Sequence, residues 1–154
     1  MSSVKVNPEL IHLEGIKILK AHFEVDEELM DAESGMESFK VDLGSSPGFD
    51  LENKMVRLRL TINIKGVDGD EKEIGVRGSY CIDFIYMIEN LDEYVSWEKS
   101  GEAFGVDENL AATISGISYS TARGIILDRT QVTEFKGIIL PVIDPYQLLD
   151  KAGK

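Results

Sequence analysis

The first half of the chain alternates hydrophobic and polar residues in the way that β-strands do. The clearest run covers 55–65, and one of its faces is apolar while the other is polar. The apolar face carries Val56, Leu58, Leu60, Ile62 and Ile64, and the polar face carries Arg57, Arg59, Thr61 and Asn63. This pattern predicts an antiparallel strand with one solvated side. Weaker runs predict further strands at 16–25, 39–43 and 71–86.

Three shorter segments separate or follow these strands. Residues 44–48 contain Gly, Ser and Pro, which favours a loop. The Asp68–Gly69 pair predicts a tight hairpin turn, because glycine tolerates a positive φ. Gly75 and Gly78 indicate a bulge or twist in the strand that returns from this turn. Residues 87–106 break the alternation, and we expect a short helix or loop that covers one edge of the sheet.

Residues 26–37 are acidic and hold neither lysine nor arginine. The segment can be a solvated loop, an acidic docking patch or a binding site for a hard cation. It lacks the Asp-x-Asp-x-Asp-Gly spacing and the closing Glu of a calcium loop. We therefore favour the solvated loop.

A long helix is expected to begin at Asp107, which is suited to an N-cap, with Glu108 in the first turn. One apolar stripe follows helical spacing: Leu110, Ile114, Ile117, Thr121 and Ile125. A second stripe consists of small residues, Ala111, Ser115, Ser118 and Ala122. Small side chains allow another backbone to approach closely. We expect this helix to pack on its own sheet and on a second helix, from another subunit or from the same one.

Asp144 and Pro145 predict the start of a short final helix, with Asp as N-cap and Pro at the first helical position. The predicted fold is α+β, with a four-stranded antiparallel sheet and with the long and short helices on one face. A chain of 154 residues with 43% hydrophobic content is expected to form a single domain over 1–154. Its ends, about 1–12 and 151–154, are expected to be flexible.

The formal net charge of −12 makes nucleic acids and anionic membranes poor partners. No apolar run approaches the roughly 18 residues that span a bilayer, and no signal peptide is visible. Cys81 is the single cysteine, which excludes an internal disulfide and any cysteine-built metal site. These features favour a cytoplasmic protein without membrane insertion.

The sequence shows no catalytic constellation. His12 and His22 have no Cys, Ser or third His at the spacing of a metal site or triad. Phosphate-binding loops and the nucleophile elbow are missing, so we expect no catalytic residue, no metal, no cofactor and no enzyme activity. A hydrolase that uses two carboxylates ranks last among the alternatives. Tyr119 and Arg123, four residues apart, are interpreted as a packing pair rather than an anion site.

Three motifs, in order, resemble the SecB family of protein-export chaperones. The first is Lys20-Ala21-His22-Phe23-Glu24, and the second is Gly78-Ser79-Tyr80-Cys81-Ile82. The third is the helix through Ile117-Ser118-Tyr119-Ser120-Thr121-Ala122-Arg123-Gly124, followed by Leu140-Pro141-Val142-Ile143-Asp144. Together the resemblance spans about 16–149. The chain has Ile117-Ser118 where the family has Phe-Pro, and the family's second long helix is shortened.

The resemblance implies a SecB-like, ATP-independent holdase that binds unfolded polypeptide clients, with a role in protein transport. It also implies a homotetramer, a dimer of dimers with the long helices at the interface. The expected interface residues are Ala111, Ser115, Ser118 and Ala122. The expected client-binding residues are Phe23, Tyr80, Ile82, Phe84, Tyr86, Trp97, Leu140, Val142 and Tyr146, and each has an alternative interpretation as plain core.

The family docks a translocation ATPase through an acidic sheet surface. Glu24 fits one such position, whereas Lys20 and Ile74 occupy others and Arg57, Arg59 and Arg77 line the polar face. These residues argue against docking of a translocation ATPase. A toxin–antitoxin system is a second candidate partner. An adaptor that binds one small ligand or one partner remains the alternative function.

Overall fold

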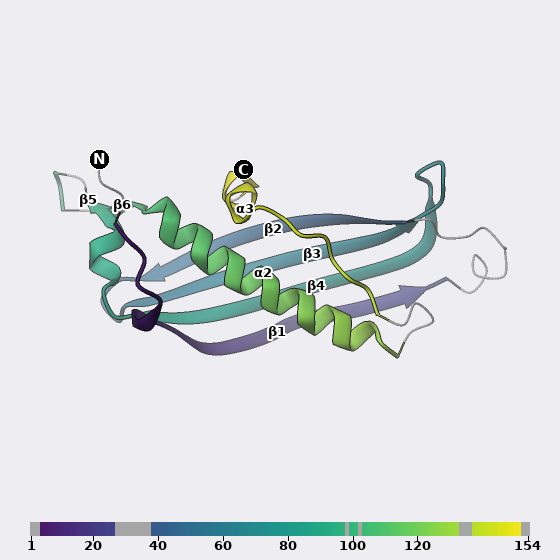
Figure 1. Ribbon diagram of the computed structural model, residues 1–154, viewed down its shortest axis with the longest axis horizontal. Helices are drawn as coiled ribbons and strands as arrows, with labels where there is room; N and C mark the ends of the chain where they lie inside the picture. Colours follow the sequence, from purple (N-terminus) through teal and green to yellow (C-terminus); the bar gives the residue numbers. More distant parts are fainter. Residues whose placement is uncertain (1–3, 27–37, 98, 102, 133–136, 152–154) are drawn as a thin grey trace.

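Four long antiparallel strands form one sheet in the order β1-β4-β3-β2, as the computed structural model shows (Figure 1). The structure describes residues 4–26, 38–97, 99–101, 103–132 and 137–151. The strands are β1 (Ile11–Val25), β2 (Ser38–Asp50), β3 (Met55–Val67) and β4 (Glu73–Ile88), and the short 3-10 helix η1 (Pro8–Leu10) precedes them. β1 and β2, consecutive in the chain, therefore lie at opposite edges of the sheet.

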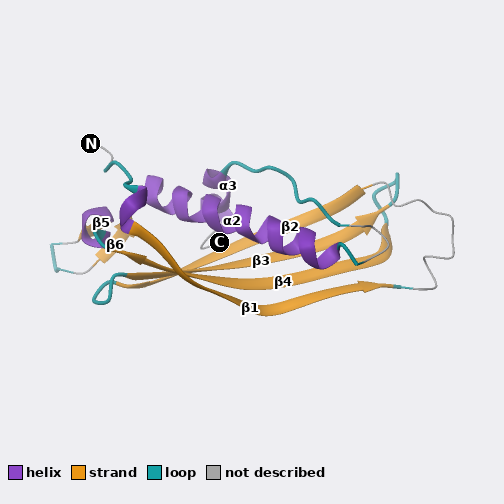
Figure 2. Cartoon of the chain, turned by 60° about the horizontal axis from the view of Figure 1, so that its bottom comes forward, coloured by secondary structure: helices purple, strands orange, loops and turns teal. Residues whose placement is uncertain are grey.

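Two helices cover one face of this sheet, α2 (Glu108–Thr130) and α3 (Pro145–Lys151) (Figure 2). Along the chain, two short features follow β4 and precede α2. They are η2 (Leu91–Tyr94) and a small hairpin of β5 (Val95–Trp97) and β6 (Ala103–Val106). No described element covers the other face of the sheet. The α+β architecture expected from the sequence is confirmed.

The core lies between the α2-facing side of β3 and β4 and the underside of α2. Paired positions such as Leu60 and Ile82, or Leu58 and Phe84, point to this side and are buried. Leu110, Ile114 and Ile126 of α2 close the core from above. Burial of each large apolar side chain contributes roughly 1.5–3 kcal/mol, so this layer is the main source of stability.

β2 is longer than the alternation indicated. Residues 44–48, expected to form a loop, continue the strand and pair with β3, for example Ser45 with Leu60 and Pro47 with Leu58. Proline lacks an N–H donor and is tolerated in strands mainly at a sheet edge, and β2 is an edge strand. The expectation of a loop was wrong because Gly, Ser and Pro favour turns but are tolerated in a strand at the edge of a sheet.

The segment 87–106 also differs from expectation. It continues β4 to Ile88 and then forms η2 and the β5–β6 hairpin, rather than one short helix or loop. Leu91 and Tyr94 of η2 are buried in the core. The hairpin is tied to the start of α2, since the Asp107 amide donates to the Tyr94 carbonyl at 2.8 Å.

The hairpin turn after β3 forms at the predicted place, but not through the expected glycine. The positive φ, 61°, belongs to Glu71. The Asp68 carboxylate organises the turn by accepting from the Asp70 and Lys72 amides at 2.9 and 3.0 Å. Gly75 has a φ of 78°, and the pairing opposite it is irregular between Lys65 and Val67.

The N-terminal residues from Val4 onward contact the body of the protein, and the flexibility of 1–12 stays a prediction. Val4 and Val6 pack against the core. The Tyr94 hydroxyl donates to the Lys5 carbonyl at 3.3 Å and holds this segment beside η2. Of the acidic stretch 26–37, all but Asp26 lies outside the described residues.

Candidate functional site

An uncharged cleft of about 400 Å³ opens between β2 and the N-terminal half of α2. β2 and β3 form its floor, α2 forms one wall, the β5–β6 hairpin closes one end, and α3 contributes Leu149. The lining residues are Ser45, Pro47, Phe49, Leu51, Val56, Leu58, Val95, Gly105, Val106, Ala111, Ile114, Ser115 and Leu149. A volume of this size and an apolar lining are typical of sites that bind small ligands or side chains of a peptide.

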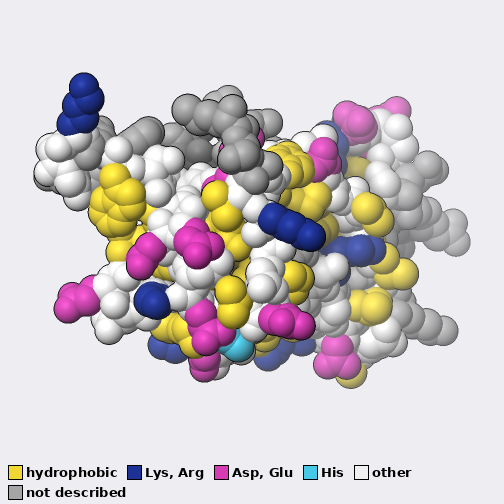
Figure 3. All heavy atoms as spheres, turned by 60° about the vertical axis from the view of Figure 1, so that its left-hand side comes forward, with side chains coloured by type: hydrophobic (Ala, Val, Ile, Leu, Met, Phe, Trp, Pro, Cys, Tyr) yellow, Lys and Arg dark blue, Asp and Glu magenta, His cyan; other side chains and the backbone are white. Residues whose placement is uncertain are grey.

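The floor of the cleft arises from the phase of β2. Ser45, Pro47 and Phe49 continue the period-2 alternation of Val41 and Leu43, so they face the same side as the core. α2 leaves their end of the sheet partly uncovered, and Phe49 is 44% exposed. The end of the molecule that carries β5 and β6 shows hydrophobic side chains at the surface among charged ones (Figure 3).

The helical wall is fixed by a strong N-cap at Asp107. Its carboxylate accepts from the amides of Asn109 and Leu110 at 2.9 and 3.3 Å, which satisfies free donors of the first turn. This cap sets where the helix begins and directs Ile114 and Ser115 toward the sheet. Ala111, one turn into the helix, is half-buried at the cleft wall.

The linker that precedes α3, residues 137–144, is hydrogen-bonded to α2 and positions α3 at the cleft. The Tyr119 hydroxyl donates to the Pro141 carbonyl, and Arg123 Nε donates to the Leu140 carbonyl at 3.1 Å. Tyr119 and Arg123 therefore anchor the linker, a role that their interpretation as a packing pair missed. The Ser45 hydroxyl donates to the Leu148 carbonyl at 3.3 Å and ties α3 to β2.

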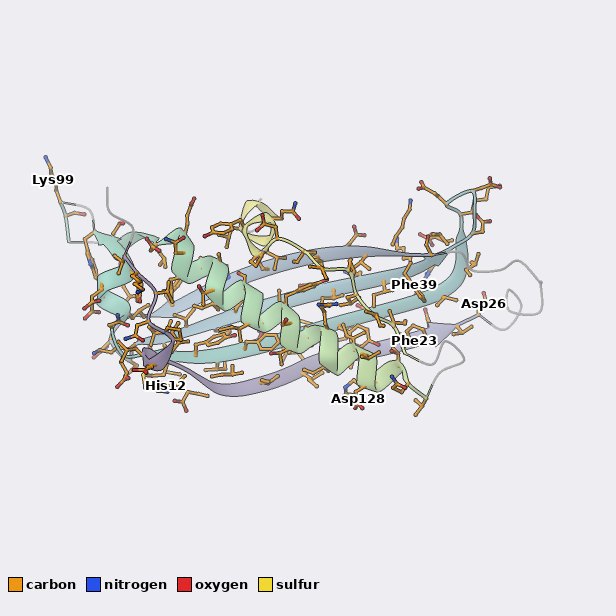
Figure 4. The ribbon with its side chains drawn as sticks, in the orientation of Figure 1. His12, Phe23, Asp26, Phe39, Lys99 and Asp128 are labelled. Carbon is orange, nitrogen blue, oxygen red and sulfur yellow. The ribbon has the colours of Figure 1, made fainter. Side chains whose placement is uncertain are left out.

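None of the nine client-binding residues predicted from the sequence lines this cleft. Five of them are at most 2% exposed and belong to the core: Tyr80, Ile82, Phe84, Tyr86 and Leu140. Phe23 is half-buried near the C-terminal end of α2 (Figure 4). Trp97, Val142 and Tyr146 are 48%, 83% and 45% exposed, on β5, the linker and α3. The structure does not bring these four together at the cleft.

Residues of the small stripe lie mostly beneath α2. Ser115, Ser118 and Ala122 are at most 2% exposed, and Ala111 is half-buried. The Ser118 and Tyr86 hydroxyls share a hydrogen bond of 2.7 Å, so the small residues make room for a tyrosine under the helix. This placement favours a close contact within one subunit, while a role in assembly stays a prediction.

Burial raises the pKa of the Tyr86 hydroxyl, with the Ser118 hydrogen bond acting in the opposite direction. Tyr86 therefore remains a neutral structural group. Among the described residues, no group of three His, Cys, Asp or Glu side chains is placed to hold a metal ion. The described helices also include none that is long and apolar enough to cross a membrane.

The cleft residues were missed because the predicted strand ended at residue 43. Their signal was present in the sequence, since Ser45, Pro47 and Phe49 keep the alternation that begins at Phe39. The other half of the signal is the small residues Ala111 and Ser115, for which the sequence predicts a place at a subunit interface. Only the three-dimensional arrangement brings β2 under the start of α2.

No protein-family model and no curated protein matches the chain. Among solved structures, it is similar to a SecB-like chaperone of Mycobacterium tuberculosis in complex with a ChAD peptide from the HigA1 antitoxin. The TM-score is 0.61 at 8% identity, over 88% of this chain and 91% of that one. A protein of unknown function from Streptococcus agalactiae matches with a TM-score of 0.41 at 16% identity, over 86% and 97%. The fold is therefore SecB-like.

Proposed function

We propose that the chain is an ATP-independent chaperone that holds apolar segments of non-native polypeptides in the cleft between β2 and α2. The observation that carries the proposal is the lining of the cleft, which has thirteen residues and no charged side chain among them. The SecB-like fold supports it, because a chaperone of that fold is known in complex with a peptide. In this proposal the protein acts in the cytoplasm, is not an enzyme and uses no cofactor.

The cleft suits side chains of an extended client better than one specific small molecule. It offers apolar contact area from Phe49, Leu58 and Ile114, with few polar groups to fix an orientation. β2 is also an edge strand, which offers backbone groups for pairing with an extended segment. Main-chain pairing with apolar side-chain contacts gives affinity with little sequence preference.

An adaptor dedicated to one partner is the second candidate. It is favoured by the structure of the SecB-like chaperone from M. tuberculosis, which is bound to a peptide of an antitoxin. The two candidates differ in breadth: a general holdase protects several unrelated denatured proteins, whereas an adaptor protects one. A role in protein transport would add a translocation ATPase to the partners.

The proposal also includes assembly into a dimer of dimers, for which the edge strand β1 is a second candidate surface beside the small stripe. β1 is an edge strand, and Leu13, Ile16 and Ile18 on its α2-facing side are 39–41% exposed. A long edge strand with exposed apolar side chains is an aggregation hazard unless a partner covers it. A second copy of the chain would provide that cover.

The test is suppression of aggregation of a chemically denatured substrate, without nucleotide, at one protein per substrate molecule. Ala111→Arg places a charged side chain in the cleft wall, and we expect it to lose most of the protection. Gly124→Arg is the matched control, since a side chain there meets no atom within 4 Å and lies on the same helix. The same loss in both variants, or no protection by the wild type, would contradict the proposal.

Three further measurements make the result specific. The mass in solution should be unchanged in Ala111→Arg, which separates a cleft effect from an effect on assembly. Thermal melting should show a folded protein, because arginine is a good helix former and Ala111 is not fully buried. Repeating the assay with three unrelated substrates distinguishes a holdase from an adaptor.

A further inference from the structure

The sheet face that the helices leave uncovered is basic, although the chain has a net charge of −12. Positions on this face follow from the strand register, in which Lys17, Asp83, Arg59 and Ser46 form one row across the four strands. Seven of the sixteen lysines and arginines lie here: Lys17, Lys20, Lys40, Arg57, Arg59, Lys65 and Arg77.

At one end of this face the positive charges are neutralised by ion pairs. Lys40 pairs with Glu71 at 3.3 Å, and Lys65 and Arg77 both pair with Glu73, at 3.0 and 3.1 Å. Glu24 of β1 shares the row of Arg77 and Lys65, and Asp42 of β2 lies in the next row. This end, next to the β3–β4 turn, carries little excess charge.

The middle of the face has a surplus of cations that we call the basic cluster, Lys17, Lys20, Arg57 and Arg59. These four residues occupy three adjacent rows of the sheet, and the only carboxylate in those rows is that of Asp83. Arg59 donates to it through two nitrogens at 2.7 and 2.9 Å. Asp83 is 5% exposed, and its carboxylate also interacts electrostatically with Arg57 and Lys17, though neither is within ion-pair distance. Within the described part of the chain, Lys17, Lys20 and Arg57 have no ion-pair partner.

Small residues keep the basic cluster open. The positions that flank it on the two edge strands are Gly15, Gly44, Ser46 and Gly48. The Arg57 guanidinium lies across Gly48, where an added Cβ would come within 3.1 Å of its nitrogen. The described positions beside the cluster on these two edge strands therefore carry no bulky side chain.

An apolar hollow adjoins the basic cluster. It has a volume of about 320 Å³ and is lined by Gly48, Phe49, Asp50, Met55, Val56, Arg57 and Ile85. Met55 and Ile85 are half-buried on the uncovered face. A ligand on this surface would thus contact the cations Lys17, Lys20 and Arg57, which have no ion-pair partner within the described residues. Beside Arg57 it would contact the apolar side chains of Met55 and Ile85.

We propose that the basic cluster and this hollow bind an acidic segment of another polypeptide that carries an apolar residue. Its carboxylates would pair with Lys17, Lys20 and Arg57, and its apolar side chain would rest on Met55 and Ile85. The site is on the opposite face from the cleft, so the two can be occupied together.

The size of the site favours a peptide over a nucleic acid. Adjacent strands lie about 4.8 Å apart, so the cluster spans about 10–15 Å across the sheet, enough for two or three carboxylates. Stable binding of duplex DNA engages about 6–10 phosphates. Asp50 and Glu14, at the margin of the site, would repel a longer polyanion, and so would the net charge of −12.

The test is fluorescence anisotropy of a labelled peptide of about twelve residues, made of Asp, Glu and Ser with one central Phe, in low salt. We expect Lys17→Glu/Arg57→Glu to weaken its affinity by at least about tenfold, which corresponds to about 1.4 kcal/mol. The matched control is Lys5→Glu/Lys99→Glu, which changes the net charge equally at two exposed lysines away from this face. Lys5 lies beside α2, and Lys99 lies at the β5–β6 end (Figure 4). The control should bind within about twofold of the wild type.

Several outcomes would overturn the proposal: no binding by the wild type, an equal loss in the control, or an unchanged affinity in Lys17→Glu/Arg57→Glu. Tighter binding of a labelled single-stranded oligonucleotide, lost in the same variant, would replace the peptide with a nucleic acid. If the double variant melts early, Lys17→Gln/Arg57→Gln replaces it with the same expectation. Ala111→Arg should bind the acidic peptide normally, so failure at the cleft and failure at this face are distinguishable.

Discussion

Ser118 and Tyr86 show how single residues set the spacing between helix and sheet. Tyr86 is 0% exposed, and its hydroxyl lies 2.7 Å from Ser118 Oγ and 3.4 Å from the Ile114 carbonyl. A larger residue at 118 would collide with the ring, and an apolar one would remove a hydrogen-bond partner. The polar pair thus fixes the height of α2 above β4.

This arrangement predicts a graded response to substitution. Ser118→Ala should lower the free energy of unfolding by about 1 kcal/mol, because one buried hydrogen bond is lost. Ser118→Leu should cost more, about 1–3 kcal/mol or above, because it also overpacks the core. Urea unfolding measures both. A Ser118→Leu protein as stable as the wild type would place this side chain outside the subunit core and favour its role in assembly.

Asp83 predicts a pH-dependent contribution to stability. The hydrogen bonds from Arg59 hold the pKa of this carboxyl below its usual range, with burial acting in the opposite direction. A carboxyl whose folded pKa is lowered stabilises the fold above its unfolded pKa, about 3.9, and loses that contribution as the pH falls through the folded pKa. Asp83→Asn should therefore lower the Tm near neutral pH, and the difference from wild type should shrink below about pH 4.

The control for this measurement is Asp92→Asn, at an exposed carboxylate of η2 that has no ion pair among the described residues. A difference between wild type and Asp83→Asn that stays constant from neutral to acid pH would contradict the linkage. It would mean that the Asn substitution acts through shape or packing rather than through charge.

Among the elements, α2 depends most on its first turn. The Asp107 carboxylate caps the helix and lies beside the cleft, at the junction with the β5–β6 hairpin. Asp107→Ala should lower the free energy of unfolding by about 1 kcal/mol, measured by urea unfolding. Asp128→Ala, near the other end of the same helix, should be neutral or slightly stabilising, since an acid there opposes the helix dipole. Equal effects of the two would argue against the cap.

The sequence predicted the elements whose patterns are local. Asp107 and Asp144–Pro145 begin helices as expected, because capping depends on a few adjacent residues. β2 was cut short, because whether Pro47 fits a strand depends on its position at a sheet edge. The cleft was not found, because it needs β2 and α2, sixty residues apart in the chain, side by side.

Aromatic residues were the least informative signal for the site. Tyr80, Phe84 and Tyr86 were predicted to line a groove and are buried under α2 instead. Periodicity gives the face of a strand but does not say which part of that face a helix covers. The exposure of the apolar residues on β1 could not be predicted either, because their pattern in the sequence is the same as that of buried core positions.

At the scale of the whole molecule, the sheet separates two kinds of surface. One face carries the helices, the apolar cleft and the apolar edge of β1, and the other carries the basic cluster. On the proposed account, non-native segments bind on the first face, and an acidic partner binds on the second. This division allows a client and a partner to be held at once.

The apolar edge predicts an oligomer. The wild-type mass in solution should be a multiple of the 17.1 kDa chain, with a tetramer expected. Ile16→Asp should reduce that mass, because a charge on the edge opposes burial against a second copy. Ile139→Asp, on the linker at a position 73% exposed, is the control and should keep the wild-type mass. A wild-type monomer in light scattering would contradict the prediction.

The most direct test of the central claim is to locate a bound client. An extended apolar peptide with a photoreactive phenylalanine analogue is crosslinked to the protein, and mass spectrometry identifies the attached residues. The account predicts attachment at the cleft, at Phe49, Val106, Ala111 or Leu149, and its loss in Ala111→Arg but not in Gly124→Arg. Attachment confined to other surfaces, or equal attachment in both variants, would contradict the claim that this cleft holds clients.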